Sequence, residues 1–271
     1  MKRILYTIAI CLFVSCEETV TIDVNQAEAK VVIQGLVTNQ PDHQYVRVSS
    51  TVGFYADGIA PAVSSANVSV SDDTGLSFSF SESTEEPGLY LPDNDFSGQV
   101  GRTYTLNVTV DGKDYTATEE LLPITTIDSM TYEIDQERFN KSDNNGNYYS
   151  ALMYTKEPQD EDNFYMFKFY RNGVWLNDNG EDITITDDVA VGEAIEGLEM
   201  PEHHSLGDSV SLEMYSLTQE QYIYWSDVAN LIFSDGGVFS PLPANPRSNI
   251  SGGALGVFQV SGLESDYVVI K

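Results

Sequence analysis

The first part of the chain alternates short apolar runs with turn residues. Within these runs β-branched and aromatic residues recur at every second position, which is the period of a β-strand. Asp111-Gly112 separates two such runs and is typical of a two-residue hairpin turn. The pattern predicts strands over residues 31–38, 45–49, 66–71, 76–81, 102–110 and 115–118. Strands at this spacing predict a β-sandwich over residues 30–126, immunoglobulin-like or transthyretin-like.

The second part of the chain, residues 127–271, continues the strand pattern and is richer in aromatic residues. Asn172-Gly173 predicts a second hairpin. The run 164–170 is apolar on nearly both faces, so we interpret it as a central strand buried on both sides and not as an exposed aromatic platform for a ligand. Strands are predicted over residues 148–155, 163–171, 174–176, 183–186, 209–216, 257–260 and 267–270.

One stretch of the second part has helical periodicity instead. Thr218 followed by Gln221 fits a capping box, and Gly236-Gly237 provides a stop, so a helix is predicted near 218–234. Its apolar stripe is predicted to pack on the sheet of the second domain. That stripe consists of Tyr222, Trp225, Val228 or Ala229, and Ile232. The fold class that follows is mainly β: an N-terminal sandwich and then a second antiparallel β domain with one main helix.

The N-terminus has the organisation of a secretory signal. Lys2 and Arg3 precede an apolar stretch over residues 4–14 that is shorter than the roughly 20 residues needed to span a bilayer. Ser15 and Cys16 close it in a pattern that resembles bacterial lipoprotein signals. We therefore expect residues 1–15 to be a signal peptide, Cys16 to carry a covalent lipid anchor, and residues 16–29 to form an acidic tether. The alternatives are an ordinary signal peptide with an incidental cysteine, or an apolar first strand.

The two residues after the cysteine indicate where in the cell the protein is located. Glu17 and Glu18 resemble the export signal that sends Bacteroidota lipoproteins to the outer face of the outer membrane. We therefore expect a lipid-anchored outer-membrane protein that faces the cell exterior, with the periplasmic face as the alternative.

Composition narrows the possible partners and chemistry. The chain has 13 basic and 42 acidic residues, a formal net charge of −29, which excludes ordinary binding to a nucleic-acid backbone. Its two cysteines are Cys11, inside the predicted signal, and Cys16. No thiol would remain for disulfides, metal binding or catalysis.

Motifs for known chemistry are missing from the sequence. It contains no Gly-x-Ser-x-Gly, no His-Glu-x-x-His and no phosphate-binding glycine loop. The adjacent His203 and His204, beside Glu202, are interpreted as exposed loop residues and not as metal ligands, and the acidic stretches 143–146 and 177–182 as turns. No catalytic residue, metal ligand or cofactor is predicted, and the ligand-binding residues are unknown. Paired carboxylates of the glycosidase type remain possible among so many acids.

Several segments together resemble a known family. They lie at residues 16–18, 30–35, 66–75, 87–90, 100–106 and 127–129, and the most specific is Asn-Ile-Ser-Gly-Gly-Ala-Leu-Gly-Val-Phe at 249–258. Gly252, Gly253 and Gly256 in that segment are expected to permit positive φ or close backbone approach. Over nearly its full length the chain resembles Bacteroidota outer-membrane lipoproteins of unknown function, often encoded beside TonB-dependent receptors.

The resemblance implies a cellular location and partners more than it implies a reaction. It implies a surface-exposed, non-enzymatic accessory or substrate-capturing subunit of a TonB-dependent outer-membrane transporter. The expected partners are the outer-membrane bilayer, through the anchor, and a TonB-dependent receptor β-barrel, with no nucleic acid. The alternatives are a surface hydrolase acting on glycan or peptide, and an adhesin or envelope-structural protein.

Overall fold

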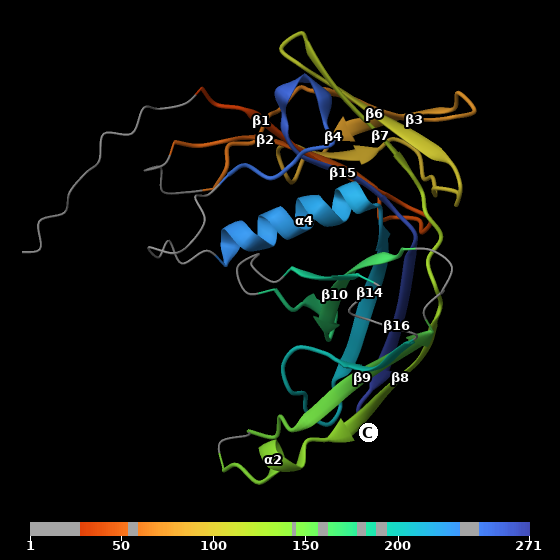
Figure 1. Ribbon diagram of the computed structural model, residues 1–271. Helices are drawn as coiled ribbons and strands as arrows, with labels where there is room; N and C mark the ends of the chain where they lie inside the picture. Colours follow the sequence, from red (N-terminus) through yellow and green to blue (C-terminus); the bar gives the residue numbers. More distant parts are fainter. Residues whose placement is uncertain are drawn as a thin grey trace, which may run out of the picture.

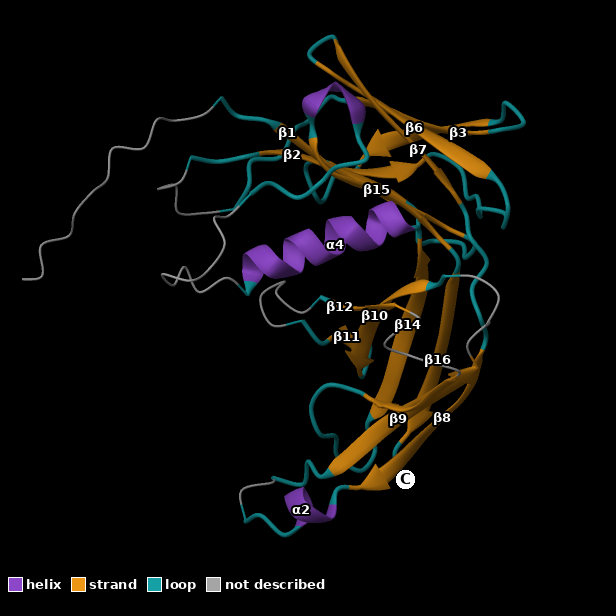
Figure 2. Cartoon of the chain, in the orientation of Figure 1, coloured by secondary structure: helices purple, strands orange, loops and turns teal. Residues whose placement is uncertain are grey.

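The computed structural model describes residues 28–53, 59–142, 145–156, 162–177, 183–187, 194–233 and 244–271. These residues form three β-sheets and one main helix, so the prediction of a mainly β fold is confirmed (Figures 1 and 2). The predictions for residues 1–15 and for Cys16, Glu17 and Glu18 lie outside the described residues. None of the helices in the described ranges is long and apolar enough to cross a membrane.

The first sheet is a single eight-stranded sheet folded over on itself. Its order is β15-β1-β2-β5-β4-β3-β6-β7. A Cβ added at Gly35 on β1 would lie 2.9 Å from the Phe258 ring on β15 and 3.3 Å from Leu106 on β6, so the two halves face each other across one apolar core. The strands are β1 (Val31–Thr38), β2 (Tyr45–Ser50), β3 (Asn67–Asp72), β4 (Ser77–Glu82), β5 (Leu89–Pro92), β6 (Thr103–Val110), β7 (Lys113–Glu120) and β15 (Leu255–Ser261).

The last strand of the first sheet comes from the far end of the sequence. β15 pairs parallel with β1, placing Gly256 opposite Ile33. Gly256 has a φ of 107°, and a Cβ there would lie 1.9 Å from the Ile33 carbonyl oxygen, so this close pairing requires glycine. The sheets therefore do not divide at residue 127 as the predicted domains do, because residues 255–261 complete the N-terminal sheet.

The rest of the chain forms a five-stranded and a three-stranded sheet. β15 continues through Gly262 into β16, which belongs to the five-stranded sheet, and an apolar core lies between the five- and three-stranded sheets. The five-stranded sheet contains β10 (Phe164–Arg171), β11 (Val174–Trp175), β12 (Thr184–Asp187), β14 (Ser209–Leu217) and β16 (Leu263–Val269). The three-stranded sheet contains β8 (Ile127–Ile134), β9 (Tyr149–Lys156) and β13 (Ala194–Glu199).

The aromatic strand β10 is central in its sheet, as predicted. It pairs with β14 on one side and with β11 and β12 on the other. Tyr165, Phe167 and Phe169 alternate along it, are at most 4% exposed, and enter the core between the two smaller sheets. The buried-strand interpretation of residues 164–170 is confirmed for this face.

Helix α4 (Gln219–Ile232) begins at the predicted position, with Thr218 as N-cap and a complete capping box with Gln221. Its predicted packing on the second sheet is only part of its environment. The ring of Tyr222 lies 4.8 Å from that of Phe164 on β10, whereas Trp225 Nε1 donates to Gln259 Oε1 on β15 over 3.0 Å. The helix therefore lies between the first and second sheets, as Figure 1 shows. The described residues also contain the short helices α2 (Gln136–Phe139) and η1 (Ser251–Gly253).

Both predicted hairpin turns are confirmed by their backbone. Asp111 and Gly112 have φ of 51° and 77°, and Asn172 and Gly173 have φ of 53° and 77°, as type I′ turns require. Gly252 and Gly253 also have positive φ, as expected.

Candidate functional site

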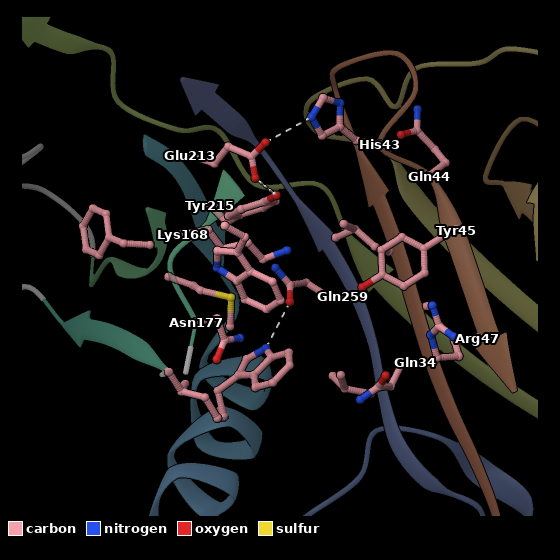
Figure 3. Close-up of a pocket in the computed structure, with 18 of the residues that line it drawn as sticks. Gln34, His43, Gln44, Tyr45, Arg47, Lys168, Asn177, Glu213, Tyr215 and Gln259 are labelled. Atoms are coloured by element: carbon pink, nitrogen blue, oxygen red, sulfur yellow. Dashed lines mark hydrogen bonds and ion pairs between the residues drawn. The ribbon is translucent and has the colours of Figure 1, made fainter. Parts of the chain in front are cut away.

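A cleft of about 630 Å³ lies between the first sheet, the second sheet and helix α4 (Figure 3). It falls within the size range of small-molecule sites. Apolar and aromatic side chains make up most of its wall, with amides and a few charged groups among them. The cleft is the candidate functional site.

The first sheet supplies the outward face of three neighbouring strands. On β1 the inward Ile33 packs in the sandwich core, and the next residue, Gln34, lines the cleft. The same alternation holds on β2 and β15, because successive side chains of a strand point to opposite faces. The cleft-lining residues on this side are Gln34 and Leu36, Tyr45 and Arg47, and Val257 and Gln259.

The second sheet supplies the opposite wall from β10 and β14. Met166, Lys168 and Tyr170 lie on the face of β10 away from the core that holds Phe167. Antiparallel pairing places Lys168 directly opposite Glu213 on β14, and Met166 opposite Tyr215. One basic and one acidic residue therefore share the face that the cleft exposes.

Glu213 is held by three side chains. The hydroxyls of Tyr170 and Tyr215 donate to its Oε2 over 2.7 and 2.6 Å. His43 Nε2 lies 3.4 Å from its Oε1, and Figure 3 shows Glu213 in contact with His43 and Tyr215. Burial and the neighbouring carboxylate raise the pKa of Tyr170 and of Tyr215 far above the ordinary tyrosine value. Both phenols therefore stay neutral and act as hydrogen-bond donors that fix the carboxylate in place.

Lys168 lies close to the faces of two aromatic rings. Its Nζ is 4.9 Å from the ring centroid of Tyr215 and 5.5 Å from that of Trp175. Within the described part of the chain no acidic group forms an ion pair with it. Burial lowers the pKa of Lys168, and the charge of Glu213 opposes that shift. The ammonium is stabilised by ring faces and keeps its N–H donors for another group.

The remaining polar groups hold the walls together. Gln259 accepts from Trp225 and donates through Nε2 to Ser261 Oγ over 3.0 Å. Tyr224 of α4 hydrogen-bonds the side chain of Gln34, and burial raises the pKa of Tyr224 to about 12. These contacts fix α4 against β1 and β15, so the cleft is preformed.

The described part of the cleft wall contains two carboxylates. Its carboxylates are Asp42 and Glu213, and the latter already accepts from two phenols. The described residues contain no group of three or more His, Cys, Asp or Glu side chains that could hold a metal ion. The arrangement is a rigid, mostly apolar slot with one ammonium group in its wall.

The histidine pair that the sequence singled out lies elsewhere. His203 Nε2 is 2.8 Å from Asp135 Oδ2, which ties the loop to the N-cap of α2. His204 is fully buried and, among the described residues, neither ring nitrogen has a hydrogen-bond partner. The interpretation of both as exposed loop residues is therefore wrong for His204, whose backbone pairs with Tyr149 of β9 and carries the side chain inward.

The sequence pattern indicated Trp225 and Val228 only as packing residues of the helix, and it did not indicate Lys168 or Glu213 as site residues. Lys168 is the charged residue inside the otherwise aromatic and apolar β10, which ends at Arg171, and Glu213 is the charged residue of β14. A charged residue inside such a strand was the available signal. Their meeting depends on the β10–β14 register, which neither strand shows alone. Of the two predicted acidic turns, residues 143–144 and 178–182 lie outside the described residues. Asn145 and Gly146 have φ of 52° and 87° and form a turn, as predicted, and Asn177 lines the cleft.

Comparison with known proteins gives a family without a described activity. No curated protein matches the chain. The family profile described as a domain of unknown function, DUF4249, matches residues 17–265, which takes in α4, every residue of the cleft and all the described strands except the end of β16. The chain therefore belongs to the DUF4249 family of domains of unknown function.

Proposed function

We propose that this protein is a non-enzymatic capture subunit, anchored by lipid at Cys16 to the outer face of the outer membrane, that holds a small ligand for a TonB-dependent transporter. The observation that carries the proposal is the preformed cleft of about 630 Å³ between the two sheets and α4. A slot with mostly apolar walls and few polar groups is the usual form of a small-molecule binding site.

The proposed anchor is compatible with a cleft that stands away from the membrane. Cys16 is separated from the start of β1 at Val31 by the predicted tether. A chain of this length reaches at most about 50 Å when extended, at roughly 3.3–3.6 Å per residue. The β-rich body can therefore reach the mouth of a neighbouring barrel while its lipid remains in the bilayer.

A binding role is favoured over the alternatives by the state of the cleft groups. Glu213 is engaged by Tyr170, Tyr215 and His43, which suits a structural role better than that of a general acid or nucleophile. The adhesin alternative would be favoured by exposed aromatic residues in 164–170, and the alternating Tyr165, Phe167 and Phe169 are buried.

The anchor is tested by membrane fractionation of cells that express Cys16→Ala or Cys11→Ala. Cys16→Ala should move the protein out of the membrane fraction, because the acylated thiol is lost. Cys11→Ala removes a thiol from inside the predicted signal and should leave the protein in the membrane. Retention of Cys16→Ala in the membrane fraction would contradict lipid anchoring there.

The transporter association is tested by copurification. The tagged full chain, solubilised in mild detergent from the outer membrane, should bring down a receptor β-barrel. The Cys16→Ala protein purified from the same cells is the matched control and should bring down much less. Recovery of the anchored chain without any barrel would count against the transporter role.

A further inference from the structure

We infer that the ligand held in the cleft is an amphipathic organic acid, with its anionic group on Lys168 and its apolar body against the surrounding rings and aliphatic side chains. This inference rests on the proposed capture function and adds the chemical class of the ligand.

Lys168 carries a partly buried ammonium group beside two aromatic rings. A partly buried ammonium group loses hydration, and that loss is offset only by a counter-charge or by hydrogen-bond acceptors. Tyr215 and Trp175 contribute their ring faces at 4.9 and 5.5 Å, and a cation–π contact of this kind is worth about 0.5–2 kcal/mol. Ring faces leave the three N–H donors of Lys168 available, so the site is incomplete without an acceptor.

Glu213, the neighbouring acid, does not supply the acceptor for Lys168. Glu213 lies across the strand pair from Lys168, and its charge acts on the ammonium, yet the two form no ion pair. The hydroxyls of Tyr170 and Tyr215 both donate to Oε2, and His43 faces Oε1. The protein thus directs this carboxylate toward phenols and imidazole and leaves the ammonium for a different anion.

The charge of the rest of the protein makes this cation unusual. The chain carries 42 acidic against 13 basic residues, so most of its surface repels anions. Arg47, the other strong cation of the cleft, is paired with Glu86 at 2.7 Å. Lys168 is therefore the basic group of the cleft wall that lacks an acidic partner among the described residues.

The apolar and aromatic residues of the cleft wall indicate the chemistry of the ligand's body. Leu36, Met166 and Val257 supply aliphatic surface from both sheets, and Tyr45 and Trp225 supply ring faces. Such a wall binds an apolar or planar body by burying its surface, and the space of about 630 Å³ admits a molecule of one to a few rings. A fully hydrated inorganic ion would leave this wall unused.

The experiment compares two fluorescent probes that differ in one charged group. 8-Anilinonaphthalene-1-sulfonate carries a sulfonate on the ring system of neutral N-phenyl-1-naphthylamine. The full chain without its signal, with Cys16 replaced by Ser for solubility, should bind the sulfonate probe at least about tenfold more tightly, since a charge-assisted hydrogen bond contributes about 1.5–3 kcal/mol. Lys168→Met should remove that preference, because the sulfonate loses its charged partner while the naphthalene ring system is the same in both probes.

Lys113→Met is the matched control. Lys113 also lies over a ring, that of Tyr115 at 4.9 Å, but it lies at the exposed hairpin end of β7, away from the cleft. Its loss should leave the affinity for both probes unchanged. An equal fall in sulfonate affinity in both variants would mean a general charge effect and would overturn the inference.

A second measurement needs no variant. Benzoate should displace the bound sulfonate probe from the unsubstituted cleft at about tenfold lower concentration than benzyl alcohol does, and phenyl phosphate in place of benzoate shows which acid group is preferred. Equal displacement by the acid and the alcohol would overturn the inference and leave capture by the cleft intact. If neither naphthalene probe binds at all, capture by the cleft itself is contradicted.

Discussion

The parallel pairing of β15 with β1 makes a strong prediction at Gly256. Replacement by Ala places a methyl group 1.9 Å from the Ile33 carbonyl oxygen, well inside the 3.4–4 Å of ordinary contact. That obstacle is backbone, so no side-chain rotation can relieve it. β15 must move away from β1, or the backbone of Gly256 must leave its φ of 107°.

The expected cost has two parts. Holding Ala in this backbone conformation costs about 1–3 kcal/mol. Separating the strands weakens the hydrogen bonds of a pairing that runs from Val32 to Thr38, at a net value of about 1 kcal/mol each. With two or three bonds affected, Gly256→Ala should lower the free energy of unfolding by about 4 kcal/mol.

Urea denaturation followed by circular dichroism measures this change, and Gly253→Ala is the control. Gly253 has a similar positive φ of 82°, but a Cβ there meets nothing within 4 Å. Its replacement should therefore cost only the conformational strain, about 1–2 kcal/mol. A Gly256→Ala protein within about 1 kcal/mol of Gly253→Ala would refute the argument from close strand approach.

Two further predictions concern buried ionisable groups. Glu119→Ala should lower the free energy of unfolding by about 3 kcal/mol in urea, because Asn249, Thr218 and Gln221 all donate to this carboxylate and would lose their acceptor. Burial raises the pKa of Glu119, so the folded state favours its protonated form. The unfolding free energy should thus fall as pH rises above the ordinary value of 4.5, and a Glu119→Gln protein with the same fall would contradict this assignment. For His204, burial lowers the pKa, so stability should decrease as pH falls below the ordinary value of 6.5. His204→Phe should flatten the melting temperature between pH 7.5 and 5.5, and an unchanged slope would show that other groups cause it.

Local features of the fold were predictable from the sequence. Short runs of β-branched and aromatic residues located β1, β6, β10 and β14, and Thr218 indicated the start of α4 through its capping box. These signals work because period, turn chemistry and caps depend on residues that are close in sequence. Three strands were missed for local reasons as well: β5 is four residues long and ends at Pro92, β8 is largely exposed, and β13 contains a bulge between Glu196 and Leu198.

Contacts between distant segments were not predictable in this way. The pairing of Val32 with Leu255 joins the two ends of the described chain, and nothing near either residue indicates its partner. The cleft depends on the same kind of information, because Lys168 and Glu213 meet through strand register and face Tyr45 from another sheet. Cys16, Glu17 and Glu18 remain predictions from sequence.

The position of β15 in the chain determines when the protein can finish folding. A polypeptide chain is synthesised from its N-terminus, so β1 emerges long before residues 255–261. Until then β1 has one open edge, and an unpaired strand edge is a template for association with other chains. Non-local pairings of this kind also form slowly. We therefore expect the N-terminal sandwich to acquire protease resistance only after residues 255–261 have emerged and paired with β1.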